Sequence, residues 1–211
     1  YDYNYISGTR RTVMDTFEEG GFYGSNEFRE QHHEFFKGKL WKGETVYYEV
    51  AGYTHTGAPI MASCDNKKLN DKEFIKQYGK ETVFSYGCIP DGYSESHPVV
   101  CGDPQSDIYV YRMTMTNEDG DVVEYTPDFM RYRCEQMGVK VVPVFAKVYV
   151  KDDTVIAHHT DGTCSGGNIP DGWTIGDAVQ DIAEKIYDGP DRIGKTHVRE
   201  GDVVRTMNRP K

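Results

Sequence analysis

The sequence predicts an α+β fold in which mostly antiparallel sheets are flanked by helices. Segments rich in β-branched and aromatic residues, such as 46–53 and 107–115, predict strands. Segments whose apolar residues recur at helical spacing, such as 26–37, predict helices. The two kinds of segment do not alternate with the regularity of βαβ units, so a parallel, doubly wound sheet is not expected.

In the first quarter of the chain we expect a strand pair, a helix and a buried strand. Residues 1–15 read as two strands interrupted at a Ser-Gly pair. Residues 26–37 predict a helix that Gly38 ends, and a buried strand follows at 46–53. His33 is expected on the solvent side of the helix, and no metal role is expected for the adjacent histidine pair. The apolar side of the helix carries Phe28, His32, Phe35 and Phe36.

The central part of the chain is expected to contain a short helix, a long loop and a hairpin. Residues 71–80 predict the helix, and residues 84–106, with their Pro, Gly and Cys, predict an irregular loop. A strand at 107–115 is followed by a turn at 117–120 and a second strand at 122–125. These two strands therefore predict a β-hairpin.

A second helix is expected directly after the hairpin. Thr126 is a capping residue, Pro127 suits the first helical position, and Gly138 suits the end. The residues expected on the apolar side of this helix are Phe129, Met130, Cys134 and Met137.

In the C-terminal third, residues 139–157 alternate enough to predict strand, turned at 151–154. The Gly- and Asp-rich residues 159–172 predict a loop. A helix is expected to begin after Thr174, and a last strand is expected at 197–207. The buried stripe expected on this helix consists of Ile175, Ala178, Val179, Ile182 and Ile186.

The composition limits the class of protein. A length of 211 residues fits one domain with a substantial core, and the 13% of aromatic residues can fill a core or stack on a base. A net charge of −10 argues against a broad basic surface that coats nucleic acid, but it leaves room for a local groove. Three clusters of basic residues could line such a groove or simply be solvated: Arg10 and Arg11; Lys37, Lys39 and Lys42; Arg199, Arg205, Arg209 and Lys211.

The cysteine pattern predicts reduced thiols, and the apolar runs predict no membrane-spanning segment. The five cysteines form no Cys-x-x-Cys pair and are odd in number, so neither a disulfide framework nor a zinc ribbon fits. Reduced thiols in the cytoplasm are expected. No apolar run is long enough to span a membrane. The chain begins at Tyr1, and we expect it to be a fragment.

Four short segments occur in an order that resembles one enzyme superfamily. They are Ser-Gly-Thr-Arg-Arg at 7–11, Val-Tyr-Tyr-Glu-Val-Ala-Gly at 46–52, Ile-Tyr-Val-Tyr-Arg-Met at 108–113 and Arg-Glu-Gly-Asp-Val-Val-Arg at 199–205. The series resembles the later motifs of the covalent nucleotidyltransferases, which are the ATP-dependent RNA and DNA ligases and the capping enzymes. The long stretch from Gly52 to Lys195 is most similar to the RNA ligases. The resemblance implies a single, incomplete nucleotidyltransferase (adenylylation) domain over 1–211.

The resemblance also implies a reaction. In this family a lysine amine attacks the α-phosphate of ATP and holds AMP as a phosphoramidate. AMP then passes to the 5′-phosphate of an RNA end, and the 3′-hydroxyl of a second end displaces it. Such chemistry needs an activated amine, Mg²⁺ or Mn²⁺ on the phosphate oxygens, further cations and a flat slot for adenine.

Five residues receive roles from the resemblance. Arg10 would contact the nucleotide or the 5′-phosphate, because a guanidinium binds two phosphate oxygens at once. Glu49 would reach the ribose, and Tyr111 and Val203 would enclose the adenine from its two sides. Glu200 would hold the divalent metal near the α-phosphate, since Mg²⁺ needs only one or two protein carboxylates.

Each role has an ordinary structural alternative. Arg10 can be a surface charge, Glu49 an edge-strand glutamate in water and Tyr111 a core tyrosine. Only one of Arg10 and Arg11 can serve, because neighbours on a strand point to opposite sides. The chain also departs from the family pattern at three places. Tyr48 stands where Gly is usual, Arg112 where many relatives have Asp, and Asp202 where an apolar residue is usual.

The nucleophile motif, Lys-x-Asp/His/Glu-Gly, does not occur. Asp-Gly is found at five places, but the residue two positions before the Asp is never Lys. Lys76 fits the motif only loosely and lies in an expected helix after the third motif, so we reject it. In the family the nucleophile precedes the Ser-Gly-Thr-Arg segment, which here means before Tyr1, and the final Lys-x-Lys pair would follow Lys211. This chain alone is therefore expected to be inactive.

The sequence thus predicts an ATP-dependent RNA ligase, or its core fragment, acting as a cytoplasmic monomer on the 5′-phosphate and 3′-hydroxyl ends of RNA. One alternative is a non-catalytic nucleotide- or RNA-binding relative, which an upstream lysine motif would argue against. Another is an ATP-dependent DNA ligase, which strand-specific sealing assays would distinguish.

Overall fold

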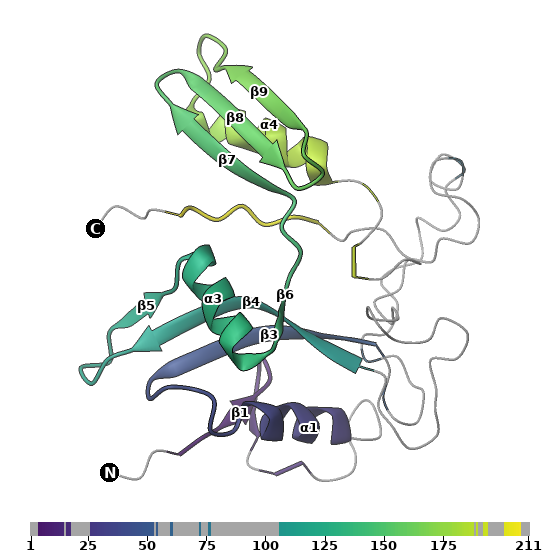
Figure 1. Ribbon diagram of the computed structural model, residues 1–211, viewed down its shortest axis with the longest axis vertical. Coiled ribbons are helices and arrows are strands. Elements are labelled where there is room, and N and C mark those ends of the chain that lie inside the picture. Colours follow the sequence, from purple (N-terminus) through teal and green to yellow (C-terminus); the bar gives the residue numbers. More distant parts are fainter. Residues whose placement is uncertain are drawn as a thin grey trace. The chain divides into compact units, whose positions relative to one another are not determined.

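The computed structural model describes residues 4–14, 16–17, 26–52, 54, 60, 72, 76, 106–187, 189, 192–193 and 201–207. The chain divides into two compact units, shown in Figure 1. Unit 1 contains Tyr1–Asp65, Ser85–Val142 and Met207–Lys211, and unit 2 contains Asn66–Phe84 and Pro143–Thr206. The fold is α+β, as the sequence predicts. A nucleotidyltransferase fold and a single domain over 1–211 stay predictions.

Unit 1 is built on a four-stranded sheet. Strands β3 (Glu44–Gly52), β4 (Ser106–Thr116) and β5 (Val122–Glu124) pair antiparallel in that order. The hairpin expected at 107–125 is therefore confirmed. The two-residue strand β6 (Lys140–Val141) pairs in parallel with β4, which the sequence does not predict. The strand expected at 46–53 begins earlier, at Glu44, and is half-buried rather than buried.

The register of β3 and β4 shifts at one place. Tyr47 lies opposite Arg112, whereas the next residue, Tyr48, lies opposite Val110. Tyr111 is therefore the extra residue of a β-bulge on β4. A bulge places two consecutive side chains opposite one residue of the neighbouring strand. Here it places both Tyr111 and Arg112 opposite Tyr47.

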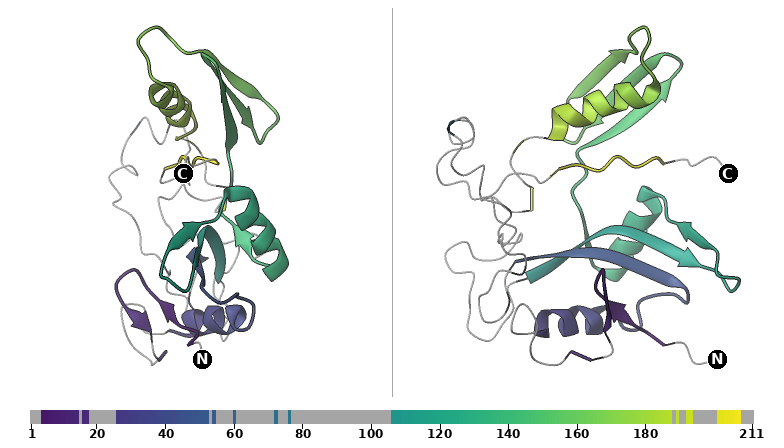
Figure 2. Two further views of the ribbon diagram at one scale, coloured as in Figure 1. Left: turned by 90° about the vertical axis from the view of Figure 1, so that its left-hand side faces the viewer. Right: turned by 180° about the vertical axis from the view of Figure 1, so that it is seen from behind.

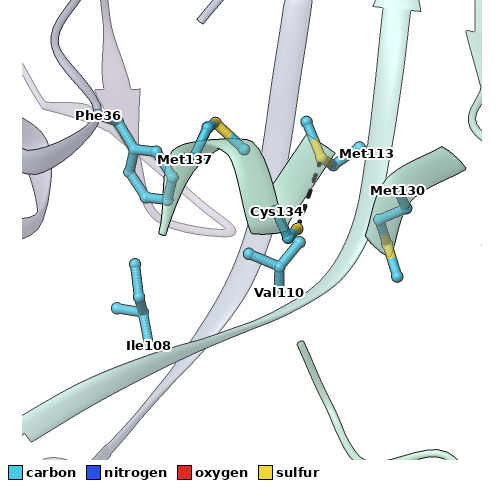
Figure 3. Close-up of a cluster of buried hydrophobic side chains, with 7 residues drawn as sticks. All are labelled: Phe36, Ile108, Val110, Met113, Met130, Cys134 and Met137. Atoms are coloured by element: carbon cyan, nitrogen blue, oxygen red, sulfur yellow. Dashed lines mark hydrogen bonds between the residues drawn. The ribbon is translucent and has the colours of Figure 1, made fainter. Parts of the chain in front are cut away.

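One face of this sheet carries the core of unit 1, with helices α1 (Glu27–Phe36) and α3 (Pro127–Met137) packed against it. Met113 on β4 contacts α3, because its Sδ lies 3.9 Å from the Sγ of Cys134. Tyr48 on β3 meets α1 through the Phe36 ring. Figure 3 shows the buried side chains of this core, which are Phe36, Ile108, Val110, Met113, Met130, Cys134 and Met137.

Helix α3 follows its local signals, whereas the side chain of Asn26 makes no capping hydrogen bond at the start of α1. The Thr126 Oγ1 accepts a hydrogen bond from the Phe129 backbone N–H, Pro127 occupies the first turn, and Gly138 ends α3 at φ 71°. Phe129 is nevertheless 39% exposed, which corrects its place in the expected core. Arg133, by contrast, is buried, because its guanidinium forms an ion pair with the Glu44 carboxylate.

The N-terminal hairpin pairs β1 (Ser7–Gly8) with β2 (Val13–Met14) and is attached to α1. The Tyr5 hydroxyl donates to the His33 carbonyl at 2.8 Å, and the Ser7 Oγ lies 2.7 Å from the His33 Nδ1. His33 therefore does not point to solvent as expected, because the hairpin covers it. His32 lies on the buried side of α1, as predicted.

Unit 2 is a three-stranded antiparallel sheet with one helix on one of its faces, as Figure 2 shows from behind. Its strands are β7 (Ala146–Lys151), β8 (Thr154–His159) and β9 (Cys164–Asn168), and its helix is α4 (Ile175–Tyr187). The turn expected at 151–154 joins β7 to β8. Side chains of β8 and α4 form the core, which consists of Val155, Ala157, Ala178 and Ile182.

Three expectations about unit 2 need correction. Residues 164–168 form β9 rather than a loop, because their backbone bonds to β8 although two glycines carry no side chain. Ile175 is exposed, because it occupies the first helical position. Residues 201–206 form no strand in the part of 197–207 that is described. Thr174 begins α4 as predicted, accepting from Asp177 N and donating to the Asp177 carboxylate.

Some expectations fall outside the described residues. The loop at 84–105 lies outside them, and so does the helix at 71–80 except for two helical positions, Lys72 and Lys76. Among the residues that are described, none of the helices is long and apolar enough to cross a membrane.

Candidate functional site

Glu49 and Tyr111 lie on the same face of the unit 1 sheet, opposite to the face that carries the core. Glu49 is paired with Tyr109, and alternation along β4 gives Tyr109 and Tyr111 the same side. Val110, between them, belongs to the core. We call this second side the polar face, defined by Tyr47, Glu49, Tyr109, Tyr111, Arg112 and Lys140.

The bulge brings two aromatic rings and one ion pair together on the polar face. The Tyr47 and Tyr111 ring centroids lie 6.4 Å apart at an angle of 48°. The Arg112 guanidinium lies 5.0 Å from the Tyr47 centroid, and its Nε lies 3.2 Å from a carboxylate oxygen of Glu124 on β5. Tyr111 is half-buried. A flat ring partly open to solvent can accept a base by stacking.

A second ion pair lies where β6 joins the sheet. The Lys140 Nζ is 2.7 Å from the Asp107 Oδ2 and 5.7 Å from the centroid of the buried Tyr109 ring. Lys140 is opposite Tyr109 in the parallel β4–β6 pairing. The sequence does not single out Lys140, because a two-residue strand has too few positions to show an alternating pattern.

Arg10 lies in the turn between β1 and β2 and is exposed. Arg11 lies in the same turn, so the two are not alternate residues of a strand as expected. The Thr9 backbone N–H donates to the Thr12 carbonyl at 2.8 Å and closes this turn. The hairpin is attached to α1, which packs on the core face of the sheet rather than on the polar face.

The remaining predicted site residues belong to the C-terminal motif. Glu200 lies outside the described residues, so its metal-binding role stays a prediction. Val203, in unit 2, is 80% exposed. The nearby Gly201 lies against α4, since a Cβ on it would be 3.6 Å from the Tyr187 ring. The strand expected at 197–207 would place Glu200 and Asp202 on one strand face, but residues 201–206 form no strand.

Among the described residues, no three His, Cys, Asp or Glu side chains gather where they could hold a metal ion. Two carboxylates beside the polar face are instead engaged with cations, Glu124 with Arg112 and Asp107 with Lys140. The described part of the polar face therefore contains aromatic rings and ion pairs, but no cluster of metal ligands.

No protein-family model matches this chain, and no curated protein or solved structure matches it either. Membership of the RNA ligase family thus stays an interpretation of four sequence segments.

Proposed function

We propose that this chain is part of an RNA ligase-like adenylyltransferase and that the polar face of unit 1 receives the adenosine of ATP. One observation carries the proposal: Glu49 and Tyr111, taken from two separate sequence motifs, lie on the same face of neighbouring strands. Had the strand register been one residue different, the two side chains would lie on opposite faces.

In the proposed complex the adenine stacks on Tyr111 and the Glu49 carboxylate accepts hydrogen bonds from the ribose hydroxyls. Stacking on an aromatic ring contributes about 1–3 kcal/mol per base. The two nearby cations, Arg112 and Lys140, are already paired with carboxylates, so they add little net charge for the phosphates. The triphosphate would therefore depend on Mg²⁺ or Mn²⁺, for which Glu200 is the proposed ligand.

The proposed reaction has three steps. A lysine amine outside residues 1–211 attacks the α-phosphorus of ATP, and pyrophosphate leaves. An oxygen of the 5′-phosphate of RNA then attacks the lysyl-AMP phosphorus and breaks its bond to nitrogen. Finally the 3′-hydroxyl of a second RNA end attacks the 5′-phosphorus, loses its proton, and AMP leaves.

Equilibrium binding of a fluorescent ATP analogue with Mg²⁺ to the 211-residue chain tests the adenosine site. Tyr111→Ala should weaken binding about 5- to 150-fold, the range that corresponds to base stacking. Tyr132→Ala is the matched control, because Tyr132 is an exposed tyrosine of α3 in the same unit. Equal affinity of Tyr111→Ala and the parent chain would refute the proposed site.

A second pair of variants tests the ribose contact. Glu49→Gln should weaken ATP more than 2′,3′-dideoxy-ATP, because only ATP offers the hydroxyl donors. Glu135→Gln, an exposed glutamate of α3, should affect neither ligand. Loss of the same factor for both ligands would contradict a ribose contact.

A further inference from the structure

We infer that the uncovered face of the unit 2 sheet binds single-stranded RNA. Alternation along the strands gives this sheet two different sides. Val155 and Ala157 of β8 point to α4 and are buried, whereas Ile156 between them is 42% exposed. We call the second side the open face. It is defined by Lys147, Tyr149 and Lys151 on β7, by Thr154, Ile156 and His158 on β8, and by the residues paired with these on β9, which are Asn168, Gly166 and Cys164.

The open face presents an exposed aromatic ring on which a base can stack. No helix or strand among the described residues of unit 2 covers it, and Figure 1 shows it on the side away from α4. Tyr149 is 56% exposed and meets the His158 ring edge-on, with centroids 5.4 Å apart. The register places Tyr149, Ile156 and Gly166 in one row across the three strands. Because Gly166 has no side chain, Tyr149 and Ile156 are the two side chains that this row presents.

The charges of unit 2 are separated between its two sides. The open face carries Lys147 and Lys151 on either side of Tyr149, and none of its residues is acidic. The solvent side of α4 carries Asp177, Asp181 and Glu184 beside Trp173, and its Lys185 is paired with Asp181, so acidic groups are in excess there. A polyanion would thus be attracted to the sheet and repelled by the helix. This local basic face occurs although the whole chain has a net charge of −10.

One more cation lies at the end of the sheet where β7 begins. The Arg192 guanidinium donates to the Val144 carbonyl at 3.1 Å and to the Thr160 Oγ1 at 2.5 Å. Strands β7, β8 and β9 themselves carry no Asp or Glu, and the nearby carboxylates Asp152, Asp153 and Asp161 lie in the turns that join them. The Asp161 Oδ1 accepts two hydrogen bonds from Thr163, which keeps it within its turn.

Lysines flanking an exposed ring on a sheet match the recognition of single-stranded nucleic acid, in which bases stack on aromatic rings and cations follow the backbone. Thr154 and Asn168 form one row with Lys151, and their side chains bond to each other at 3.3 Å. A hydroxyl and an amide beside the lysine can bond to a ribose 2′-hydroxyl, so the occupant we assign is RNA. The inference goes beyond the proposed function and does not rest on it, because its residues take no part in nucleotide binding.

Fluorescence anisotropy of a labelled short oligouridylate with the 211-residue chain tests this surface. The parent should bind at low salt, and Tyr149→Ala should weaken binding at least about fivefold, the lower end for base stacking. Tyr149→Phe should keep most of the affinity, because the ring is retained. Tyr132→Ala and Lys185→Gln, an exposed lysine on α4, are the controls and should bind as the parent does.

Salt dependence tests the lysines separately. In a plot of log affinity against log salt concentration, the double variant Lys147→Gln/Lys151→Gln should have a slope about 1.4 smaller in magnitude than the parent's. This difference corresponds to two phosphate contacts on a single strand. The oligodeoxyuridylate of the same length should bind more weakly than the RNA. The affinity for ATP should be the same in all these variants as in the parent. Loss of RNA binding can therefore be distinguished from loss of ATP binding.

Four results would overturn the inference. The first is no binding of oligouridylate by the parent chain at low salt. The second is parent-like RNA binding by both Tyr149→Ala and the double lysine variant. The third is DNA binding at least as tight as RNA binding. If sedimentation shows a parent dimer that Tyr149→Ala dissociates, the open face is an interface between copies, and this too overturns RNA as its occupant.

Discussion

The Arg133 guanidinium and the Glu44 carboxylate form a two-pronged ion pair inside unit 1. The Nη2–Oε2 distance is 2.7 Å and the Nε–Oε1 distance is 2.8 Å, between side chains that are almost fully buried. The Trp41 ring covers the guanidinium at a centroid distance of 4.0 Å. The backbone N–H of Trp41 and the hydroxyl of Tyr125 donate hydrogen bonds to the Glu44 carboxylate. Arg133 also donates to the Lys39 carbonyl. The pair therefore joins α3 to the start of β3, and its further bonds reach the turn before β3 and the residue that follows β5.

Removing one partner of this pair should be strongly destabilising. Arg133→Met should lower the free energy of unfolding by about 3–5 kcal/mol, because it leaves the Glu44 charge buried without its partner. Arg131→Met, two positions earlier on the surface of α3, removes only a solvent-accessible pair with Asp128 and should cost less than about 1 kcal/mol. Urea unfolding measures both. Equal losses in the two variants would contradict the structural importance of the pair.

The buried histidine of α1 should make stability depend on pH. Burial lowers the pKa of His32 from 6.5 to about 4, although the charge of Asp107 opposes this shift. Because the unfolded chain binds the proton more readily, the stability from neutral His32 is complete above pH 6.5 and is lost as the pH falls from 6.5 toward 4. Between pH 8 and pH 5 the expected loss is about 2 kcal/mol.

Urea unfolding across this pH range measures the effect, and His32→Phe should remove most of it because the phenyl ring does not titrate. His158→Gln is the control, since His158 is exposed. Glu44 does not disturb this window. Burial favours its neutral form, but bonds from Arg133, Trp41 and Tyr125 outweigh burial and lower its pKa, so its contribution is lost only at more acidic pH. A parent-like pH profile for His32→Phe would contradict the prediction.

Gly166 should be required for β9, whereas its neighbour should not be. Gly166 has φ 115°, and a Cβ there would lie 2.1 Å from the Val155 carbonyl oxygen. Gly166→Ala should therefore destabilise unit 2 by about 1–3 kcal/mol. Gly167→Ala is the matched control, because nothing lies within 4 Å of its Cβ position. Hydrogen exchange of the β8–β9 amides should accelerate only in the first variant; equal exchange in both would rule out this strain.

Adenylylation tests the proposed enzyme. The 211-residue chain should gain no label from α-labelled ATP and Mg²⁺, since we find no amine in the family's motif. A longer form of the protein that carries an upstream lysine motif should be labelled. Glu200→Ala should abolish this label, because the metal on the α-phosphate loses its proposed ligand.

In the same longer form, Tyr111→Ala should weaken ATP binding yet retain some labelling, and Arg10→Ala should impair transfer to the 5′-phosphate at least as much as the first step. An acid-labile AMP adduct on the 211-residue chain would contradict the upstream nucleophile. Lys140 and Lys76 would then be the amines to substitute. Parent-like RNA joining by all three variants would refute the assigned site.

The sequence by itself determined the elements whose signals are local. Helix α3 begins at Thr126-Pro127 and ends at Gly138 because a hydroxyl cap, a fixed φ and a left-handed glycine act within one turn of the chain. The β4–β5 hairpin and the start of α4 follow for the same reason. The α+β class was predictable from these elements.

Only the tertiary structure decided the features that depend on distant partners. Arg133 is buried because Glu44, 89 positions earlier, meets it, whereas Phe129, which was expected in the core, is 39% exposed. The glycine-rich β9 exists because β8 supplies backbone hydrogen bonds, and hydropathy carries no record of them. Likewise, the sequence supplied Glu49 and Tyr111 as candidates, but their place on one face depends on the pairing register and the bulge, which chain-distant strands set together.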